Sequence, residues 1–259
     1  MTRRFPASLS SLFVPFFAFF GDVFGLLWES ALYIGRGAVS YRHTVRQMAV
    51  VGADSLLVAI ITVGFSGAVA AFNLSQALVR YGQGGFVGLF VGKSLTLEVA
   101  PVITAVVIAA RAGSAMAAEL GTMKVTEQVD ALRSLATSPT QYLVVPRVLA
   151  TLIMLPLITA LACVAGTIGG AMAASASGVA PSAYWQSLQR LDMSDPINGL
   201  IKTIPFALII ALVGCRQGLN TNGGAAGVGR ATTSAVVFAL IGIFVADFFL
   251  SVILNDTLF

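Results

Sequence analysis

Charged residues and the usual metal-binding or nucleophilic side chains are scarce in this sequence. Only 10% of its 259 residues are Asp, Glu, Lys or Arg, and His43 is the only histidine. A single histidine excludes most Ser-His-Asp and His-metal schemes, which need histidine beside other placed groups. Cys163 and Cys215 lie in apolar runs without a CxxC spacing, so neither a disulfide nor a metal site is expected. No catalytic residue, metal or cofactor is predicted.

Apolar residues, in contrast, dominate the chain. Hydrophobic residues make up 57% of it, and the mean hydropathy of +0.91 exceeds what a soluble core needs. This composition indicates a polytopic membrane protein. The net charge of +4 comes from basic residues spread through short loops, so lipid headgroups are expected as counter-charges and nucleic acid is not.

Five long apolar runs predict five membrane-spanning helices within residues 48–254. Their approximate ranges are 48–72, 95–118, 142–174, 196–215 and 231–254. Each run is long enough to cross a bilayer as a helix. Because no linker or second soluble domain is visible, residues 1–259 are predicted to be one all-α transmembrane domain.

The segment 9–37 differs from these runs because polar residues interrupt it regularly. Asp22, Gly25, Glu29, Tyr33, Arg36 and Ser40 recur at intervals of three or four. This spacing gives a helix one polar stripe, as in helices that lie in the membrane interface. A signal peptide or a further span is the alternative, but it would place Asp22 and Glu29 in hydrocarbon. We therefore favour an N-terminal interfacial helix.

Basic residues predict which side faces the cytoplasm. One side carries Arg3, Arg4, Arg36, Arg42, Arg46, Lys124, Arg133, Arg147, Arg216 and Arg230. The other side carries Arg80, Lys93, Arg190 and Lys202. Lys and Arg are enriched in cytoplasmic loops, so the first side is predicted to be cytoplasmic.

The most polar stretch lies on that side, between the second and third predicted spans. Its charged residues are Glu119, Lys124, Glu127, Asp130 and Arg133. Acidic residues soon after Thr126, a basic residue near the end and a following Pro139 are typical of a short helix. Taken alone, this pattern is compatible with a solvated loop helix that has no partner.

Three segments of the sequence together resemble the MlaE/YrbE family of ABC-transporter permeases. They are LEVAPVITAVVIAARAGSAMAAELGTMKVTEQVDAL, YLVVPRVLA and GGAAGVGRATTSAVV, and the resemblance runs from about residue 47 to 250. It implies a permease subunit that moves phospholipids or related lipids with an MCE-domain partner. It further implies a homodimer, a separate cytoplasmic ATPase and a bacterial inner membrane.

The resemblance also changes the interpretation of the polar stretch. The segment that matches Glu119 to Leu132 is implied to be the coupling helix that docks on the ATPase. Glu119, Lys124, Glu127, Asp130 and Arg133 are thus the expected ATPase-coupling residues. The chain departs from many family members at Ser138 and Ala226, where an acidic residue is common.

One segment imitates a phosphate-binding loop. GGFVGLFVGKS ends in Gly-Lys-Ser, but Val87 stands where a Walker A motif needs its first glycine. The segment also lies between two predicted spans and follows no strand. Nucleotide hydrolysis is therefore expected in the partner and not in this chain.

Several charged residues fall inside or beside the predicted spans. Glu98 precedes Glu119 by 21 residues, or roughly 31 Å of helix, about one hydrocarbon thickness. The resemblance implies that Glu98 lies at the rim of a lipid-binding cavity, while snorkelling or pairing with Lys93 is the alternative. Asp54 and Arg111 both fall in the cytoplasmic half, and a structural ion pair is expected. Asp247 has no assigned role.

Small residues recur at intervals of four in two of the spans. Ala110, Ser114 and Ala118 form one series, Gly113, Ala117 and Gly121 a second, and Gly166 and Gly170 a GxxxG. Such series allow close contact between helix backbones. Packing within one chain and a dimer interface both fit this pattern.

Two functions from other classes remain open on the residues alone. An intramembrane lipid-modifying enzyme would use Glu98 or Asp247 as acid or base. An ion-coupled secondary transporter would use the same carboxylates as proton sites. Both would operate without an ATPase, whereas the permease requires one.

Overall fold

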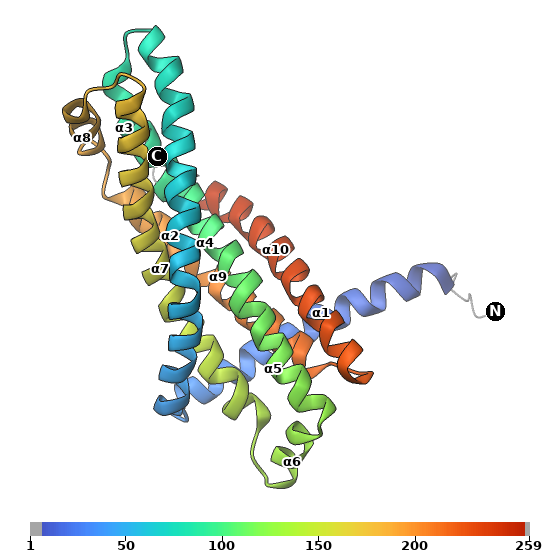
Figure 1. The fold of residues 1–259 in the computed structure, drawn as a ribbon. Helices are drawn as coiled ribbons and strands as arrows, with labels where there is room; N and C mark the ends of the chain where they lie inside the picture. Colours follow the sequence, from blue (N-terminus) through green and yellow to red (C-terminus); the bar gives the residue numbers. More distant parts are fainter. Residues whose placement is uncertain (1–6, 257–259) are drawn as a thin grey trace.

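The computed structural model describes residues 7–256, with side chains described for residues 17–254, and this part contains helices and no β-strand. Four long helices run along the bundle: α2 (Tyr41–Arg80), α7 (Val145–Ala176), α9 (Ser194–Leu219) and α10 (Gly224–Asp256). A fifth, segmented helix runs between them (Figure 1). The prediction of an all-α protein is confirmed for the described residues.

The segmented helix is the second predicted span, and π-helical turns interrupt it. After the 3₁₀ turn η1 (Gly84–Phe86) it comprises α3 (Val87–Ser94), η2 (Leu95–Val99), α4 (Ala100–Ile108), η3 (Ala109–Gly113) and α5 (Ser114–Val125). Both η2 and η3 are π-helical, and a third π-helical turn, η4 (Thr140–Val144), precedes α7. A π turn adds a residue to the helical turn, which rotates the side chains beyond it.

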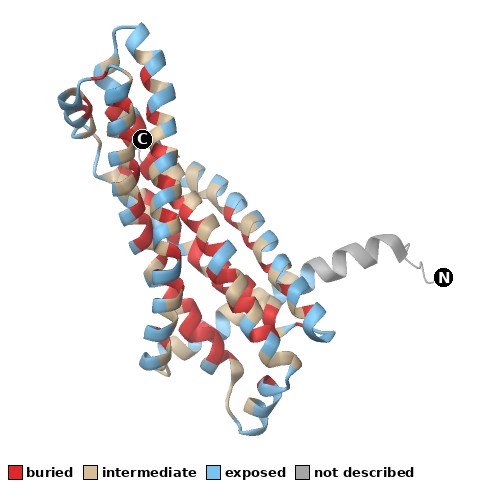
Figure 2. Cartoon of the chain, viewed as in Figure 1, coloured by how far each residue is buried: buried red, intermediate tan, exposed pale blue. Residues whose placement is uncertain are grey.

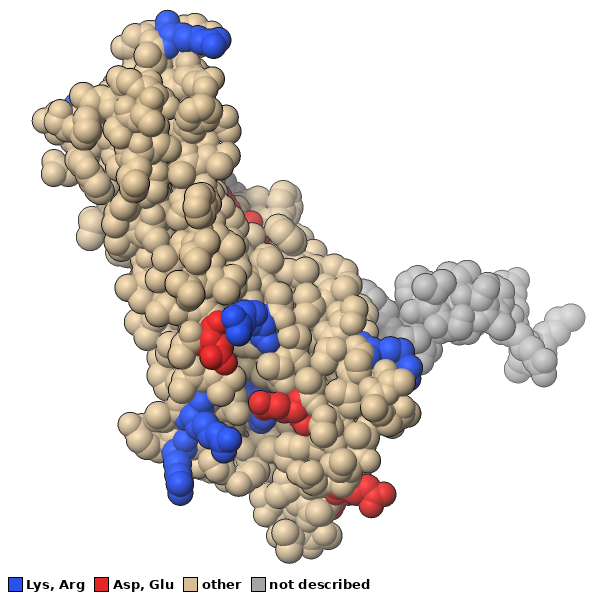
Figure 3. Space-filling view, viewed as in Figure 1, with Lys and Arg blue, Asp and Glu red and all other residues tan. Residues whose placement is uncertain are grey.

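Two short helices mark opposite ends of the bundle. The helix α6 (Gln128–Ser134) follows α5 at one end, and α8 (Pro181–Leu188) follows α7 at the other (Figure 1). Arg80 lies at the α8 end, and many of the remaining basic and acidic side chains visible in Figure 3 lie toward the α6 end. The α6 end thus corresponds to the side that is rich in Lys and Arg, which the sequence predicts to be cytoplasmic, and the α8 end corresponds to the opposite side.

The N-terminal helix α1 (Ala7–Gly35) takes a different direction from the bundle. It leaves the α6 end sideways (Figure 1), where it contacts α9, η4 and α7. Six helical stretches of the described chain are long and apolar enough to span a membrane, namely the five predicted ones and residues Phe17–Gly35 of α1. The direction of α1 favours the interfacial placement, which stays a prediction.

Glycines allow the closest helix contacts inside the bundle. A Cβ on Gly67 of α2 would overlap the backbone oxygen of Gly166 in α7. In the same way, a Cβ on Gly214 of α9 would lie 2.9 Å from the oxygen of Gly113. Figure 2 shows the resulting buried surface along the inner faces of the helices. The GxxxG of α7 therefore packs within the chain, as the first of its two interpretations predicted.

Candidate functional site

A charged cluster joins the end of α5 to α6. Lys124 Nζ donates hydrogen bonds to both carboxylate oxygens of Asp130, at 3.1 and 3.0 Å. Arg133 Nη1 donates to Asp130 Oδ1 at 3.2 Å. The hydrogen bond from Lys124 is the largest effect that holds the pKa of Asp130 below its usual range, and the charges of both cations act in the same direction.

The backbone also fixes the direction of α6. Glu127 precedes the helix in the left-handed region with φ of 63°, where residues other than glycine are strained. Val129 is buried and packs into the main hydrophobic core, while Glu127 and Arg133 remain exposed. The result is a short helix that is anchored by one apolar side chain and presents charges outward.

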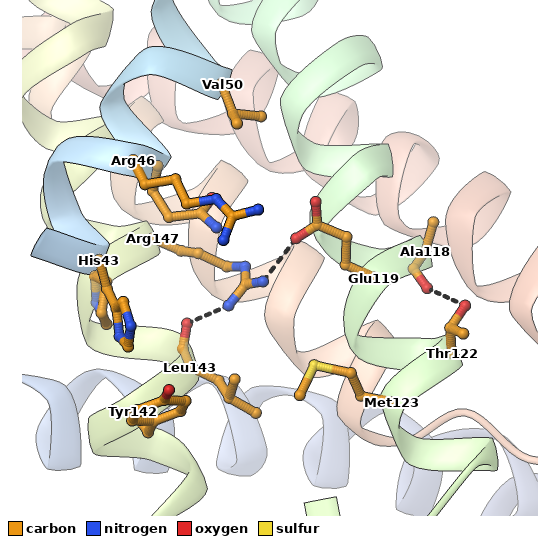
Figure 4. A pocket seen from close by; sticks show the side chains of 12 residues that line it. His43, Arg46, Val50, Ala118, Glu119, Thr122, Met123, Tyr142, Leu143 and Arg147 are labelled. Atoms are coloured by element: carbon orange, nitrogen blue, oxygen red, sulfur yellow. Dashed lines mark hydrogen bonds and ion pairs between the residues drawn. The ribbon is translucent and has the colours of Figure 1, made fainter. Parts of the chain in front are cut away.

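Glu119, the remaining predicted coupling residue, lies apart from this cluster. Its Oε2 accepts a 2.7 Å hydrogen bond from Arg147 Nη2, and Arg147 Nη1 donates to the backbone oxygen of Leu143 (Figure 4). Arg147 is only 6% exposed. The structure therefore brings Lys124, Asp130 and Arg133 together and assigns Glu119 to a different charged pair.

That pair lines a cavity of about 600 Å³ between the starts of α2 and η4–α7 and the end of α5. His43 and Arg46 contribute from α2, and Tyr142 from η4 (Figure 4). The rings of His43 and Tyr142 pack edge to face, with their centroids 4.8 Å apart. This cavity could not be predicted from the sequence, because its residues come from three separate segments.

A second ion cluster lies in the membrane-spanning part, toward the end opposite α6. Lys202 is 1% exposed, and its Nζ donates to Glu98 Oε1 at 2.7 Å, to Ser251 Oγ at 2.7 Å and to Asp247 Oδ1 at 3.3 Å. Ser251 Oγ also donates to Glu98 at 3.1 Å. One ammonium group thus contacts two carboxyl groups and one hydroxyl group.

This cluster supplies the partners that the sequence left open. Lys93 pairs with Asp195 at 3.8 Å, so the partner of Glu98 is Lys202 and not Lys93. Asp247, which had no assigned role, belongs to the same cluster. The sequence did contain an indication of this cluster, because Lys202, Glu98 and Asp247 all lie in apolar runs. Charged side chains inside a membrane need partners of opposite charge, so these three residues were candidates to pair with one another. The lipid-cavity role of Glu98 stays a prediction.

The expected partners Asp54 and Arg111 lie in α2 and in the π-helical turn η3. Both are exposed, and none of the ion pairs found among the described side chains joins them. Their pairing stays a prediction. Their exposure on the single chain leaves both side chains free to contact other groups.

The face of α1 that packs on the core carries Phe19, Val23, Leu26 and Leu27, and two residues of the polar stripe, Asp22 and Glu29, contact the bundle beside it. Asp22 accepts hydrogen bonds from Arg216 at 2.9 and 3.2 Å, and the Arg216 guanidinium lies 4.5 Å from the centre of the Phe19 ring. Glu29 accepts a 2.7 Å hydrogen bond from Thr140. Phe17, Phe20, Phe24 and Trp28 are exposed. The two acids that argued against a span thus attach α1 to α9 and η4.

Known proteins are similar to this chain over most of its length. The family model described as Permease MlaE matches residues 44–253. A probable ABC transporter permease protein of Synechocystis is 46% identical over 230 residues, which cover 88% of each chain. The protein TRIGALACTOSYLDIACYLGLYCEROL 1, chloroplastic, of Arabidopsis thaliana is 40% identical over 86% of this chain and 64% of its own length. A probable ABC transporter permease protein of Rickettsia typhi is 40% identical over 81% of this chain and 82% of that protein. The chain belongs to the MlaE permease family.

Proposed function

We propose that this chain is the membrane subunit of an ABC transporter that passes phospholipids or related lipids between a bacterial inner membrane and an MCE-domain partner. Two copies form a homodimer, and each binds a cytoplasmic ATPase subunit that hydrolyses the ATP. The chain itself performs no covalent chemistry. The observation that carries the ATPase part of the proposal is the charged, anchored helix α6.

Helix α6 is positioned to transmit a displacement from the ATPase subunit to the membrane-spanning helices. Val129 anchors α6 in the core, and the Lys124–Asp130 contact links α6 to the end of α5. Helix α5 continues through η3 and α4 to η2, which carries Glu98. A displacement of α6 would therefore reach the Lys202 cluster along one segmented helix, with the two π-helical turns as places where the helix bends.

The Lys202 cluster is the proposed lipid-facing end of this path. Glu98 keeps 46% of its side chain exposed although Lys202 is buried, so the carboxylate borders the space beside the helices. The Arabidopsis relative is named after a lipid, trigalactosyldiacylglycerol, which favours a lipid as the substrate of this chain as well. A shift of η2 would change the position of Glu98 and, with it, the shape of the lipid site.

Charge reversal on α6 tests the ATPase contact. The variant Glu127→Lys with Asp130→Lys should lose the ATPase during purification of the complex, because two exposed negative charges become positive. The matched control is Gln186→Lys with Gln189→Lys, which adds two positive charges to exposed positions at the α8 end. Unchanged co-purification and unchanged ATP turnover of the α6 variant would contradict the assignment.

The Lys202 cluster also supports a second candidate function. Ionisable groups buried within a membrane are typical of proton-coupled transporters, and this cluster combines a lysine with two carboxylates. Liposomes that contain only the purified chain separate the two functions. Lipid movement driven by a pH gradient without any ATPase would favour the ion-coupled transporter, and movement that requires the ATPase and ATP would favour the permease.

A further inference from the structure

The cavity beside Arg147 has the size and the chemistry of a ligand site. Its volume of about 600 Å³ falls within the range of cavities that bind small molecules. Its wall combines basic groups, such as Arg46 and Arg147, with apolar side chains that include Val50, Met123 and Pro146. None of the residues of the charged cluster, Lys124, Asp130 and Arg133, lines it.

Arg147 is incompletely satisfied within the described structure. Its two terminal nitrogens donate to Glu119 and to the backbone oxygen of Leu143. Its Nε has no hydrogen-bond partner, and the other unpartnered buried polar atoms of the described residues are hydroxyl oxygens of Ser and Thr. Of the five N–H donors of the guanidinium, the contacts with Glu119 and Leu143 use two, so Arg147 keeps unused hydrogen-bonding capacity beside the cavity.

The charge balance of the cavity favours an anion. Arg46 and Arg147 carry two positive charges against the single negative charge of Glu119, which leaves one positive charge before His43 is considered. In Figure 4 the guanidinium groups of Arg46 and Arg147 both point toward the centre of the cavity. Arg46 takes part in none of the ion pairs found among the described residues. Two arginines that converge on one space suit the oxygens of a phosphate group.

The position in the bundle identifies the source of that phosphate. The cavity opens at the ends of α2, α5 and η4–α7, and Glu119 in its wall is roughly 31 Å of helix from Glu98. One wall is therefore at the level of the headgroups on the α6 side of the membrane. The apolar residues Val50, Met123 and Pro146 would border the start of the acyl chains, whereas a free phosphate ion would leave them without a contact.

We infer that this cavity binds the anionic phosphodiester headgroup of a lipid in the leaflet on the α6 side, with Arg46 and Arg147 as its ligands. The site is separate from the Lys202 cluster, which lies toward the other end of the spanning helices and contains two carboxyl groups around one lysine. The inference does not depend on the proposed transport function, because lipid binding at this site requires neither the ATPase nor transport.

Photo-crosslinking in nanodiscs tests the site. The full-length chain is placed in phosphatidylcholine nanodiscs that contain a small fraction of phosphatidylglycerol with a photoactivatable headgroup, and crosslinked peptides are mapped. Adducts are expected in the peptides around residues 43–50, 118–123 and 142–147. Arg46→Gln should reduce their yield about tenfold, the effect of losing one charge-assisted hydrogen bond to an anion. Arg46 is exposed, so this change does not threaten the fold.

Arg42→Gln is the matched control, since Arg42 is exposed one helical turn away and does not line the cavity. It removes the same charge and should leave capture near the wild-type level. An equal loss for both variants would indicate general surface attraction and overturn the site. Adducts elsewhere, equal capture of a photoactivatable phosphatidylcholine, or displacement of the probe by excess inorganic phosphate would each overturn it too.

Discussion

Lys202 Nζ lies 2.7 Å from Glu98 Oε1, and this contact joins α9 to the π-helical turn η2 within the membrane-spanning part of the bundle. Asp247 and Ser251 of α10 complete the cluster, so three helical elements meet at one buried ammonium group. Removing the lysine alone would leave the two acidic groups without a counter-charge, and removing both acidic groups would leave a buried ammonium group without one.

Loss of the lysine should therefore destabilise the protein strongly. Lys202→Met leaves two carboxylates without their cation, and we expect a loss of about 3–5 kcal/mol in the free energy of unfolding. The variant that combines Lys202→Met, Glu98→Gln and Asp247→Asn should recover most of this loss, because no unpaired charge remains. Thermal unfolding in detergent measures both. Equal stability of Lys202→Met and the wild-type protein would show that the cluster is not a structural link.

The close contact of α2 with α7 predicts a steric effect of one methyl group. Gly67→Ala would press its Cβ against the backbone of Gly166, and we expect a destabilisation of about 1–3 kcal/mol by overpacking. Gly229→Ala is the matched control, because nothing lies within 4 Å of its added Cβ in α10. The control should be neutral or stabilising, since alanine favours helix. A Gly67→Ala protein that unfolds at the wild-type temperature would contradict the packing.

Glu98 provides the test of the lipid path. A photo-crosslinking residue at position 98 should capture lipid in an assembled complex, because nearly half of the Glu98 side chain is exposed. Glu98→Gln keeps the shape and should reduce lipid transport at normal protein level. Glu98→Lys would place a second cation against Lys202, so loss of folded protein is expected there and the Gln variant is the informative one. Absence of lipid capture, together with normal transport by Glu98→Gln, would reduce Glu98 to a structural role.

The predicted sidedness can be measured with two cysteines in a variant that lacks Cys163 and Cys215. Gln186 in α8 and Asn222 after α9 are both exposed and lie at opposite ends of the bundle. Gln186→Cys should react with an impermeant thiol reagent added to intact cells, whereas Asn222→Cys should be protected until the membrane is opened. The reverse pattern would invert the orientation and place α6 outside.

The sequence alone determined the helical class, the five spans and the short helix between the second and third. These features are local, because apolar run length and the positions of charges and prolines fix them before any tertiary contact forms. The polar stripe of α1 was also visible, and Asp22 and Glu29 lie on the face that contacts the bundle. The family was recognisable from residues that lie in three stretches of the chain.

Tertiary structure decided which charges meet. Glu98 and Lys202 are 104 residues apart, and Glu119 and Arg147 are 28 apart, so helix periodicity carries no information about either pair. The π-helical turns η2 and η3 also rotate side chains away from the faces that a regular helix predicts. In the folded chain Glu98 pairs with Lys202, whereas the sequence had suggested Lys93, and Arg147 lies in the wall of a cavity. Burial makes such pairs obligatory, but only the packing of the helices selects the partners.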